Sequence, residues 1–266
     1  MITAAQQRII DEITQILDCV EGVEAVWLAG SLGIGRGDAF SDVDLLVLTA
    51  GEALADVSRA VARNIADMVD PAYSGSLHGG RVLNFVTDDW TRFDLALVQH
   101  ADLSRYDAGS LIELFNKTGS RPSSPPAAPY KTSPEQLLAL VTEFLRILGL
   151  APVAVGREEY ELALTGIDHL RRMTFELMLE ENGVAPSMRG GALRRNPMLS
   201  AEQRAELATL PPLVAERSSI IAGEAAFARI FLPRARRLAA SIGAPWPTRL
   251  EEATRRHLRR SLEMRI

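Results

Sequence analysis

Cysteine is almost absent from this 266-residue sequence, in which Cys19 is the only one. A single cysteine excludes an internal disulfide and also excludes zinc sites built from several cysteines. Because Cys19 stands among apolar positions, we expect it to be a buried thiol without a chemical role.

Long apolar runs are lacking as well. No uninterrupted run approaches the ~18–20 residues that a membrane helix needs, although 47% of the residues are hydrophobic. Residues 1–17 place acids among their apolar positions and carry no basic segment ahead of a clean apolar stretch, unlike a signal peptide. We therefore expect a cytoplasmic protein without membrane contact.

An excess of positive charge is also missing. The formal net charge of −5 disfavours a general nucleic-acid binder. The histidines are scattered and show neither H-E-x-x-H nor another paired spacing, which argues against a zinc site. No histidine stands in a pattern with serine or with cysteine, so nucleophilic hydrolase chemistry is disfavoured. These histidines are His78, His100, His169 and His257.

Apolar periodicity predicts an N-terminal part that mixes helices and strands. Some segments repeat apolar residues at helical spacing, and others are short runs rich in Val, Leu and Phe. We expect helices over 3–19 and 52–69, and strands over 23–29, 43–49, 81–87 and 91–99. The last two strands flank a polar turn and form a hairpin.

A proline-rich stretch separates this part from a helical one. Residues 121–130 contain four prolines, which continue neither a helix nor a central strand. We expect an N-terminal domain over 1–120, an extended linker over 121–132 and a helical domain over 133–266. An ordered strap across a domain face is the alternative for the proline-rich stretch. Helices are expected over 134–149, 157–181, 213–241 with a bend at Pro233, and 248–264, with a further helix start at Ser200–Gln203.

The stretch between the first two predicted strands contains the candidate site residues. It reads Gly30-Ser31, ten residues, then Asp42-x-Asp44 at the start of an apolar strand. It lacks the Lys-Ser/Thr pair of a P-loop and the third glycine of a dinucleotide fingerprint. Because side chains alternate along a strand, both carboxylates point to one side and would repel each other unless they share a hard cation. Magnesium prefers such oxygen ligands, while the glycine backbone and the serine hydroxyl suit phosphate oxygens.

This arrangement resembles the nucleotidyltransferase superfamily that includes DNA polymerase β. The length and layout are similar to those of the lincosamide and aminoglycoside adenylyltransferases. The resemblance implies an α+β N-terminal nucleotidyltransferase-fold domain, with a mixed sheet flanked by helices, followed by an all-α C-terminal domain that binds the substrate.

The resemblance also implies a third carboxylate on a neighbouring strand, and Asp94 in TRFDLALV is the candidate. It implies that Asp42, Asp44 and Asp94 bind two Mg²⁺ ions, with Asp94 able to accept the proton of an attacking hydroxyl. Gly30 and Ser31 would bind the β- and γ-phosphates of a nucleoside triphosphate, ATP above all.

Further candidates have a structural alternative of equal or greater weight. Ser41 belongs to the phosphate-binding set, but we expect it mainly to orient the loop. Arg36 could reach a phosphate or could be solvated. In the helical half, Arg189, Arg194 and Arg195 could meet a triphosphate, although a solvated charge cluster is favoured.

The function that follows is transfer of a nucleoside monophosphate, AMP above all, to a hydroxyl of a small molecule such as an aminoglycoside or lincosamide-like antibiotic. One alternative is a protein or RNA acceptor, of which RNA is disfavoured by the charge. Another is a non-catalytic, antitoxin-like interaction protein, which the fused helical half disfavours. The sequence leaves open whether a homodimer completes the site.

Overall fold

The computed structural model describes residues 2–51, 54–124, 129–189 and 195–266. The chain divides into two compact units, Met1–Pro126 and Ala127–Ile266, each with a hydrophobic core of its own. The fold class expected from the sequence is confirmed, with a mixed sheet flanked by helices in the first unit and helices throughout the second.

The first unit is built on a six-stranded sheet in the order β3-β4-β5-β2-β1-β6. The two central strands, β2 and β5, run parallel, and the other neighbouring pairs are antiparallel. The strands are β1 (Val23–Leu28), β2 (Val43–Thr49), β3 (Tyr73–Leu77), β4 (Val82–Val86), β5 (Arg92–Val98) and β6 (Ile112–Asn116).

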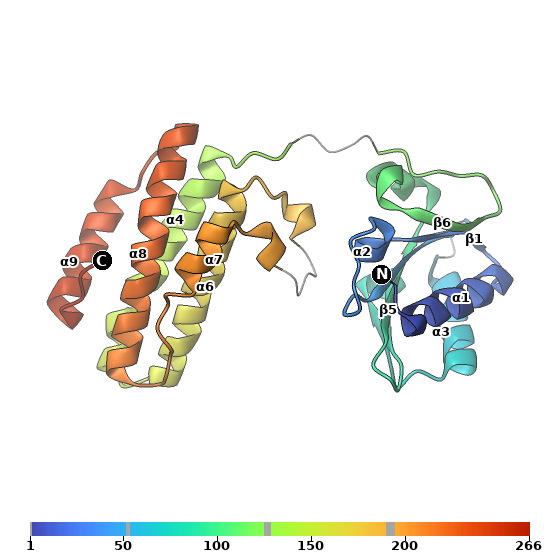
Figure 1. The fold of residues 1–266 in the computed structure, drawn as a ribbon, viewed down its shortest axis with the longest axis horizontal. Helices are drawn as coiled ribbons and strands as arrows, with labels where there is room; N and C mark the ends of the chain where they lie inside the picture. Colours follow the sequence, from blue (N-terminus) through green and yellow to red (C-terminus); the bar gives the residue numbers. More distant parts are fainter. Residues whose placement is uncertain (1, 52–53, 125–128, 190–194) are drawn as a thin grey trace. The chain divides into compact units, whose positions relative to one another are not determined.

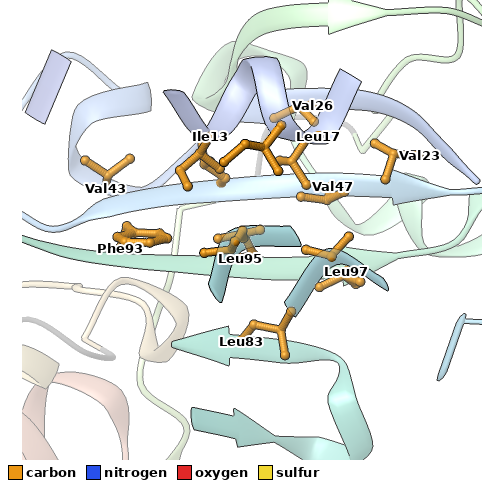
Figure 2. Close-up of a cluster of buried hydrophobic side chains, with 14 of the residues drawn as sticks. Ile13, Leu17, Val23, Val26, Val43, Val47, Leu83, Phe93, Leu95 and Leu97 are labelled. Carbon is orange, nitrogen blue, oxygen red and sulfur yellow. The ribbon is translucent and has the colours of Figure 1, made fainter. Parts of the chain in front are cut away.

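Two amphipathic helices, α1 (Ala4–Cys19) and α3 (Leu54–Val69), cover one face of this sheet (Figure 1). Alternate residues of β2 and β5 point into the core beneath them. Figure 2 shows part of this cluster, including Ile13 and Leu17 of α1, Val43 and Val47 of β2, and Phe93, Leu95 and Leu97 of β5.

The intervening residues of β2 and β5 point to the opposite face. There Leu46, Leu48 and Val98 pack with Trp27 and Leu103 in a smaller cluster. Asp44 and Asp94 have the same alternation and lie at the start of this second face. The strands therefore bury their apolar residues on both faces while presenting the two carboxylates at one end.

The second unit consists of helices packed around its own core (Figure 1). The rings of Phe144 and Phe231 stack in this core with centroids 3.7 Å apart. The helices are α4 (Pro134–Leu148), α5 (Ala151–Gly156), α6 (Tyr160–Glu181), α7 (Ala201–Leu207), α8 (Arg217–Ile242) and α9 (Thr248–Leu262).

Several secondary-structure elements and the exposure of one residue differ from the sequence-based expectations. Cys19 is exposed rather than buried, because it is the last residue of α1 and lies off its apolar stripe. The glycine-rich turn contains one helical turn, α2 (Gly30–Gly33). Strands β3 and β6 and short 3-10 helices at His78–Gly80, His100–Arg105, Ala108–Ser110, Pro186–Met188 and Asn196–Met198 were not expected.

One stretch meets the length and composition of a membrane helix despite the charged residues within it. Pro134–Gly156, at 23 residues, contains an 18-residue window with a mean hydropathy of 1.9, so it is long and apolar enough to cross a membrane by length and composition. Within it, Leu137, Val141 and Phe144 are buried in the core of the second unit. Glu143 and Arg146 form an ion pair on the same helix. Because core helices of soluble proteins meet the same criterion, this stretch is weak evidence for a membrane.

Candidate active site

Three carboxylates converge where β2 and β5 begin. The parallel register places Asp44 of β2 directly beside Asp94 of β5, and Asp42 lies two residues ahead of Asp44. One oxygen from each of the three side chains lies within 4.8 Å of the others, and all three residues are half-buried. The structure thus brings together the predicted acids, which come from segments fifty residues apart.

Burial and the neighbouring negative charges disfavour ionisation of Asp44. The pKa of Asp44 is raised to about 6, first by burial and then by the negative charges of Asp42 and Asp94, while Arg92 opposes the shift. A divalent cation between the carboxylates would offset this repulsion. An all-oxygen donor set of carboxylates suits magnesium, which binds through one or two carboxylates and substrate phosphates.

Gly30 lies against Asp44 so closely that no side chain fits. A Cβ atom at this position would stand 1.8 Å from Asp44 Oδ2, and the backbone has a φ of +57°, which favours glycine. The amide of the preceding residue, Ala29, donates to the carbonyl oxygen of Asp44 at 2.8 Å. The end of β1 and the glycine turn are therefore held directly beside the acidic cluster.

Ser31 supplies a polar atom without a partner. Its Oγ is buried and has no hydrogen-bond partner among the residues that the structure describes. A buried hydroxyl without a partner costs free energy, which a ligand that accepts its hydrogen bond would recover. The donor set at this turn therefore fits a phosphate oxygen of a nucleotide, next to carboxylates that fit its metal ion.

Ser41 and Arg36 form hydrogen bonds in the loop that follows α2. The Ser41 hydroxyl accepts from the Asp38 amide at 3.0 Å and donates to the Asp38 carboxylate at 3.2 Å. This contact matches the loop-orienting role expected for it, and its phosphate role stays a prediction. The Arg36 amide donates to the Ser31 carbonyl at 2.8 Å, and its contact with phosphate also stays a prediction.

The arginines of the helical half have contacts within their own unit. Arg189 bonds Glu176 at 2.9 Å and Glu180 at 2.7 Å, and its side chain is 10% exposed, so it is a packed ion pair rather than a solvated charge. Arg195 lies 3.8 Å from Glu176. Arg194 lies outside the described residues.

Two residues near the acids were not found from the sequence. Arg92 stands two positions before Asp94 on the same strand, and its Nη2 donates to the Phe40 carbonyl at 3.0 Å. Strand alternation alone could have placed it on the face of Asp94. Gln6 of α1 donates to the carbonyl oxygens of Asp38 and Ser41 in the same loop. No local sequence pattern predicts this contact.

Comparison with known proteins yields only structural likenesses. No known protein family and no curated protein matches the sequence. Among solved structures, the chain is similar to an aminoglycoside 6-adenyltransferase from Bacillus subtilis, at 14% identity and a TM-score of 0.44, covering 94% of this chain and 96% of that chain.

Two further structures show the same kind of likeness. A Thermotoga maritima CCA-adding enzyme complexed with tRNA is 14% identical, with a TM-score of 0.37 and coverage of 98% of this chain and 71% of that chain. A STING-associated CdnE c-di-GMP synthase from Capnocytophaga granulosa is 11% identical, with a TM-score of 0.33 and coverage of 89% and 80%. Likeness at this level gives neither activity nor substrate to this chain.

Proposed function

We propose that this protein is a metal-dependent nucleotidyltransferase. The observation that carries the proposal is the cluster of Asp42, Asp44 and Asp94, whose oxygens lie within 4.8 Å of one another. A turn that excludes a side chain at Gly30 and carries an unpartnered hydroxyl at Ser31 stands next to this cluster. Carboxylates for metal ions beside donors for phosphate form a site for a metal-bound triphosphate.

Each residue has a role in this proposal. Asp42, Asp44 and Asp94 would hold two magnesium ions, which when bound would neutralise charge on the triphosphate and favour in-line displacement. The Ser31 hydroxyl donates to a β- or γ-phosphate oxygen, and Gly30 lets the backbone approach the phosphates closely. Positioning and charge stabilisation then provide most of the catalysis.

The proposed reaction transfers one nucleoside monophosphate. The oxygen of an acceptor hydroxyl bonds to the α-phosphorus as the bond between that phosphorus and the pyrophosphate oxygen breaks. The hydroxyl proton passes to Asp94, whose carboxylate faces the cluster from β5, and pyrophosphate leaves. No oxidant, reductant or further reactant is required.

For the acceptor we propose a hydroxylated small molecule, with an aminoglycoside or lincosamide-like antibiotic as the first class to test and ATP as the first nucleotide. The net charge of −5 favours this class over RNA. The similarity of the motif and of the two-part layout to antibiotic adenylyltransferases supports it as well. We place the reaction in the cytoplasm, where nucleoside triphosphates are supplied.

The test measures pyrophosphate release with magnesium, each nucleoside triphosphate, and a panel of aminoglycosides and lincosamides. We expect acceptor-dependent release that Asp44→Asn lowers at least ~100-fold, since this substitution removes a metal ligand. Asp67→Asn, on the exposed surface of α3, is the matched control and should retain activity.

Other outcomes separate the alternatives. Label that appears on a protein or RNA instead of a small molecule would replace the proposed acceptor but keep the chemistry. Transfer by Asp44→Asn at the wild-type rate would show that the acidic cluster is not the catalytic site. No transfer with any nucleotide, together with a co-purifying partner, would favour an interaction protein.

A further inference from the structure

Asp42 differs from the other two acids in how its position is fixed. Asp44 and Asp94 are paired in the parallel register of β2 and β5, whereas β2 begins at Val43 and leaves Asp42 in the preceding loop. The sheet therefore does not hold Asp42 in place. Its oxygen nonetheless lies within 4.8 Å of oxygens of the other two, so other contacts must position the loop.

The loop over residues 38–41 is partly held by its own hydrogen bonds. The Asp38 carboxylate accepts from the Phe40 amide at 3.0 Å and from the Ser41 hydroxyl at 3.2 Å. These bonds fix the local turn, but they do not fix where the turn lies relative to the sheet. That requires contacts from elements outside the loop.

Gln6 of α1 provides two such contacts from a buried position. Its side-chain amide nitrogen donates to the carbonyl oxygen of Asp38 at 2.9 Å and to that of Ser41 at 2.7 Å. Gln6 is only 3% exposed, so water does not replace these bonds easily. The Ser41 carbonyl belongs to the peptide bond that leads into Asp42, so this contact holds the metal ligand at its own backbone.

The other end of the same amide is also occupied. The Gln6 Oε1 accepts from the backbone amide of Thr3 at 2.7 Å, while the backbone amide of Gln6 donates to Thr3 Oγ1 at 3.1 Å, and the two bonds form a capping box at the start of α1. The oxygen caps the helix and the nitrogen holds the loop. A flipped amide would place its oxygen against two carbonyl oxygens, so the orientation is set by these contacts.

Arg92 completes the attachment from the sheet. Its guanidinium donates to the Phe40 carbonyl at 3.0 Å, between the two carbonyls that Gln6 holds. Two side chains from α1 and β5 thus hold three carbonyl groups of a four-residue loop. Of the two, Gln6 acts without a charge that would itself change cation binding.

We propose that Gln6 is a positioning residue for the metal ligand Asp42. Its amide ties the capped start of α1 to the Ser41–Asp42 peptide and so keeps the Asp42 carboxylate facing Asp44 and Asp94. The proposal rests on the proposed function insofar as Asp42 is a metal ligand. Residues that orient metal ligands typically affect metal affinity about 10- to 100-fold.

The test separates the two ends of the Gln6 amide. Gln6→Glu keeps an oxygen for the Thr3 amide but removes both donors to the loop, and Gln6→Leu removes every hydrogen bond of the side chain without adding charge. Thr3→Val is the matched control, because it removes the Oγ1 cap and leaves the loop contacts in place. We would measure Mn²⁺ affinity by electron paramagnetic resonance, and amide hydrogen exchange over residues 38–42.

We expect both Gln6 variants to bind Mn²⁺ about tenfold more weakly, with faster exchange in the loop. Thr3→Val should lower the melting temperature but keep Mn²⁺ affinity within twofold of wild type. The proposal is overturned if Gln6→Leu, folded by circular dichroism, binds Mn²⁺ within twofold of wild type. It is also overturned if Thr3→Val weakens binding as much as the Gln6 variants.

These readouts do not depend on transferase activity. Wild-type protein that binds Mn²⁺ and responds to the Gln6 variants, but transfers no nucleotide, would contradict the proposed function and leave the role of Gln6 intact. Wild-type protein that transfers nucleotide, with Gln6 variants of unchanged affinity and exchange, would contradict only the role of Gln6.

Discussion

At the scale of single residues, the close approach of Gly30 to Asp44 requires a residue without a side chain at position 30. In Gly30→Ala, the new methyl group would overlap Asp44 Oδ2, 1.8 Å away, so the carboxylate must move. We expect Mn²⁺ affinity to fall at least ~10-fold, because the displaced oxygen is a metal ligand. Titration of both proteins with Mn²⁺ measures the difference.

Gly35→Ala is the control for backbone strain in this prediction. Gly35 also has a positive φ, +69°, but a Cβ atom there would meet nothing within 4 Å. Both substitutions therefore cost about 1 kcal/mol of left-handed strain, and only Gly30→Ala also displaces a ligand. Equal Mn²⁺ affinities for the two variants would contradict the role assigned to the contact.

The raised pKa of Asp44 predicts how metal binding depends on pH. Protons compete with the metal for this carboxylate, and burial with the charges of Asp42 and Asp94 brings its pKa to about 6. Above that pH the carboxylate is ionised, and below it each pH unit lowers the ionised fraction about tenfold. We expect Mn²⁺ to bind about tenfold more weakly at pH 5 than at pH 7.5. An affinity that stays constant between these values would contradict the prediction.

The same scale shows which site residues the sequence could reveal. The pairing of Asp42 with Asp44 could be predicted because the two acids stand two residues apart at the start of an apolar strand, and Asp94 became a candidate because the family resemblance implies a third carboxylate on a neighbouring strand. Gln6 could not, because its contact with Ser41 joins residues thirty-five positions apart through a loop without periodicity. A side chain that holds a loop through its backbone carbonyl groups produces no periodic pattern in the sequence.

At the scale of elements, burial decides which strands the sequence reveals. Strands β2 and β5 are buried and apolar, and they were predicted almost to the residue. Strand β3, with the sequence YSGSL, lies at the edge of the sheet and is largely exposed. Because it packs little apolar surface, its composition indicates a turn, and only pairing with β4 makes it a strand.

Helix α8 offers a prediction about stability at this scale. The chain continues as one helix through Pro233, whose ring removes a hydrogen bond from the helix interior and whose side chain is exposed. We expect Pro233→Ala to stabilise the protein by ~1–3 kcal/mol, measured by chemical denaturation. Pro134→Ala is the control, because proline is favourable at the first turn of α4, and it should not stabilise. A Pro233→Ala variant less stable than wild type would mean that the ring provides packing that α8 requires.

At the scale of the whole molecule, the two units have separate cores, so an ionisable side chain buried in one unit acts on the stability of that unit. Glu224 of α8 is 4% exposed, and its Oε2 has no hydrogen-bond partner within the described part of the chain. Burial raises its pKa from 4.5 to about 8. Glu251 of α9 is the opposite case: burial opposes its ionisation, but hydrogen bonds from Arg236, Trp246 and Arg255 outweigh this and lower its pKa to about 2.

The raised pKa of Glu224 predicts that the helical unit loses stability as pH rises. The unfolded chain ionises this carboxyl above pH 4.5, whereas the folded chain keeps it protonated up to about pH 8. Stability is therefore complete below pH 4.5 and falls as pH rises to 8, by roughly 3 kcal/mol at pH 7. Gln mimics the protonated acid, so Glu224→Gln should match wild type at pH 4.5 and be more stable at pH 7.

Hydrogen exchange measured separately over 1–126 and 127–266 locates this effect, which we expect only in the second range. Glu251→Gln provides the control of opposite sign. Because ionised Glu251 stabilises the fold above its unfolded pKa, this variant should be most destabilised at neutral pH and approach wild type as pH falls from 4.5 towards 2. If Glu224→Gln and wild type show the same dependence on pH, then water or a partner group reaches Glu224 and its burial does not govern the stability of the helical unit.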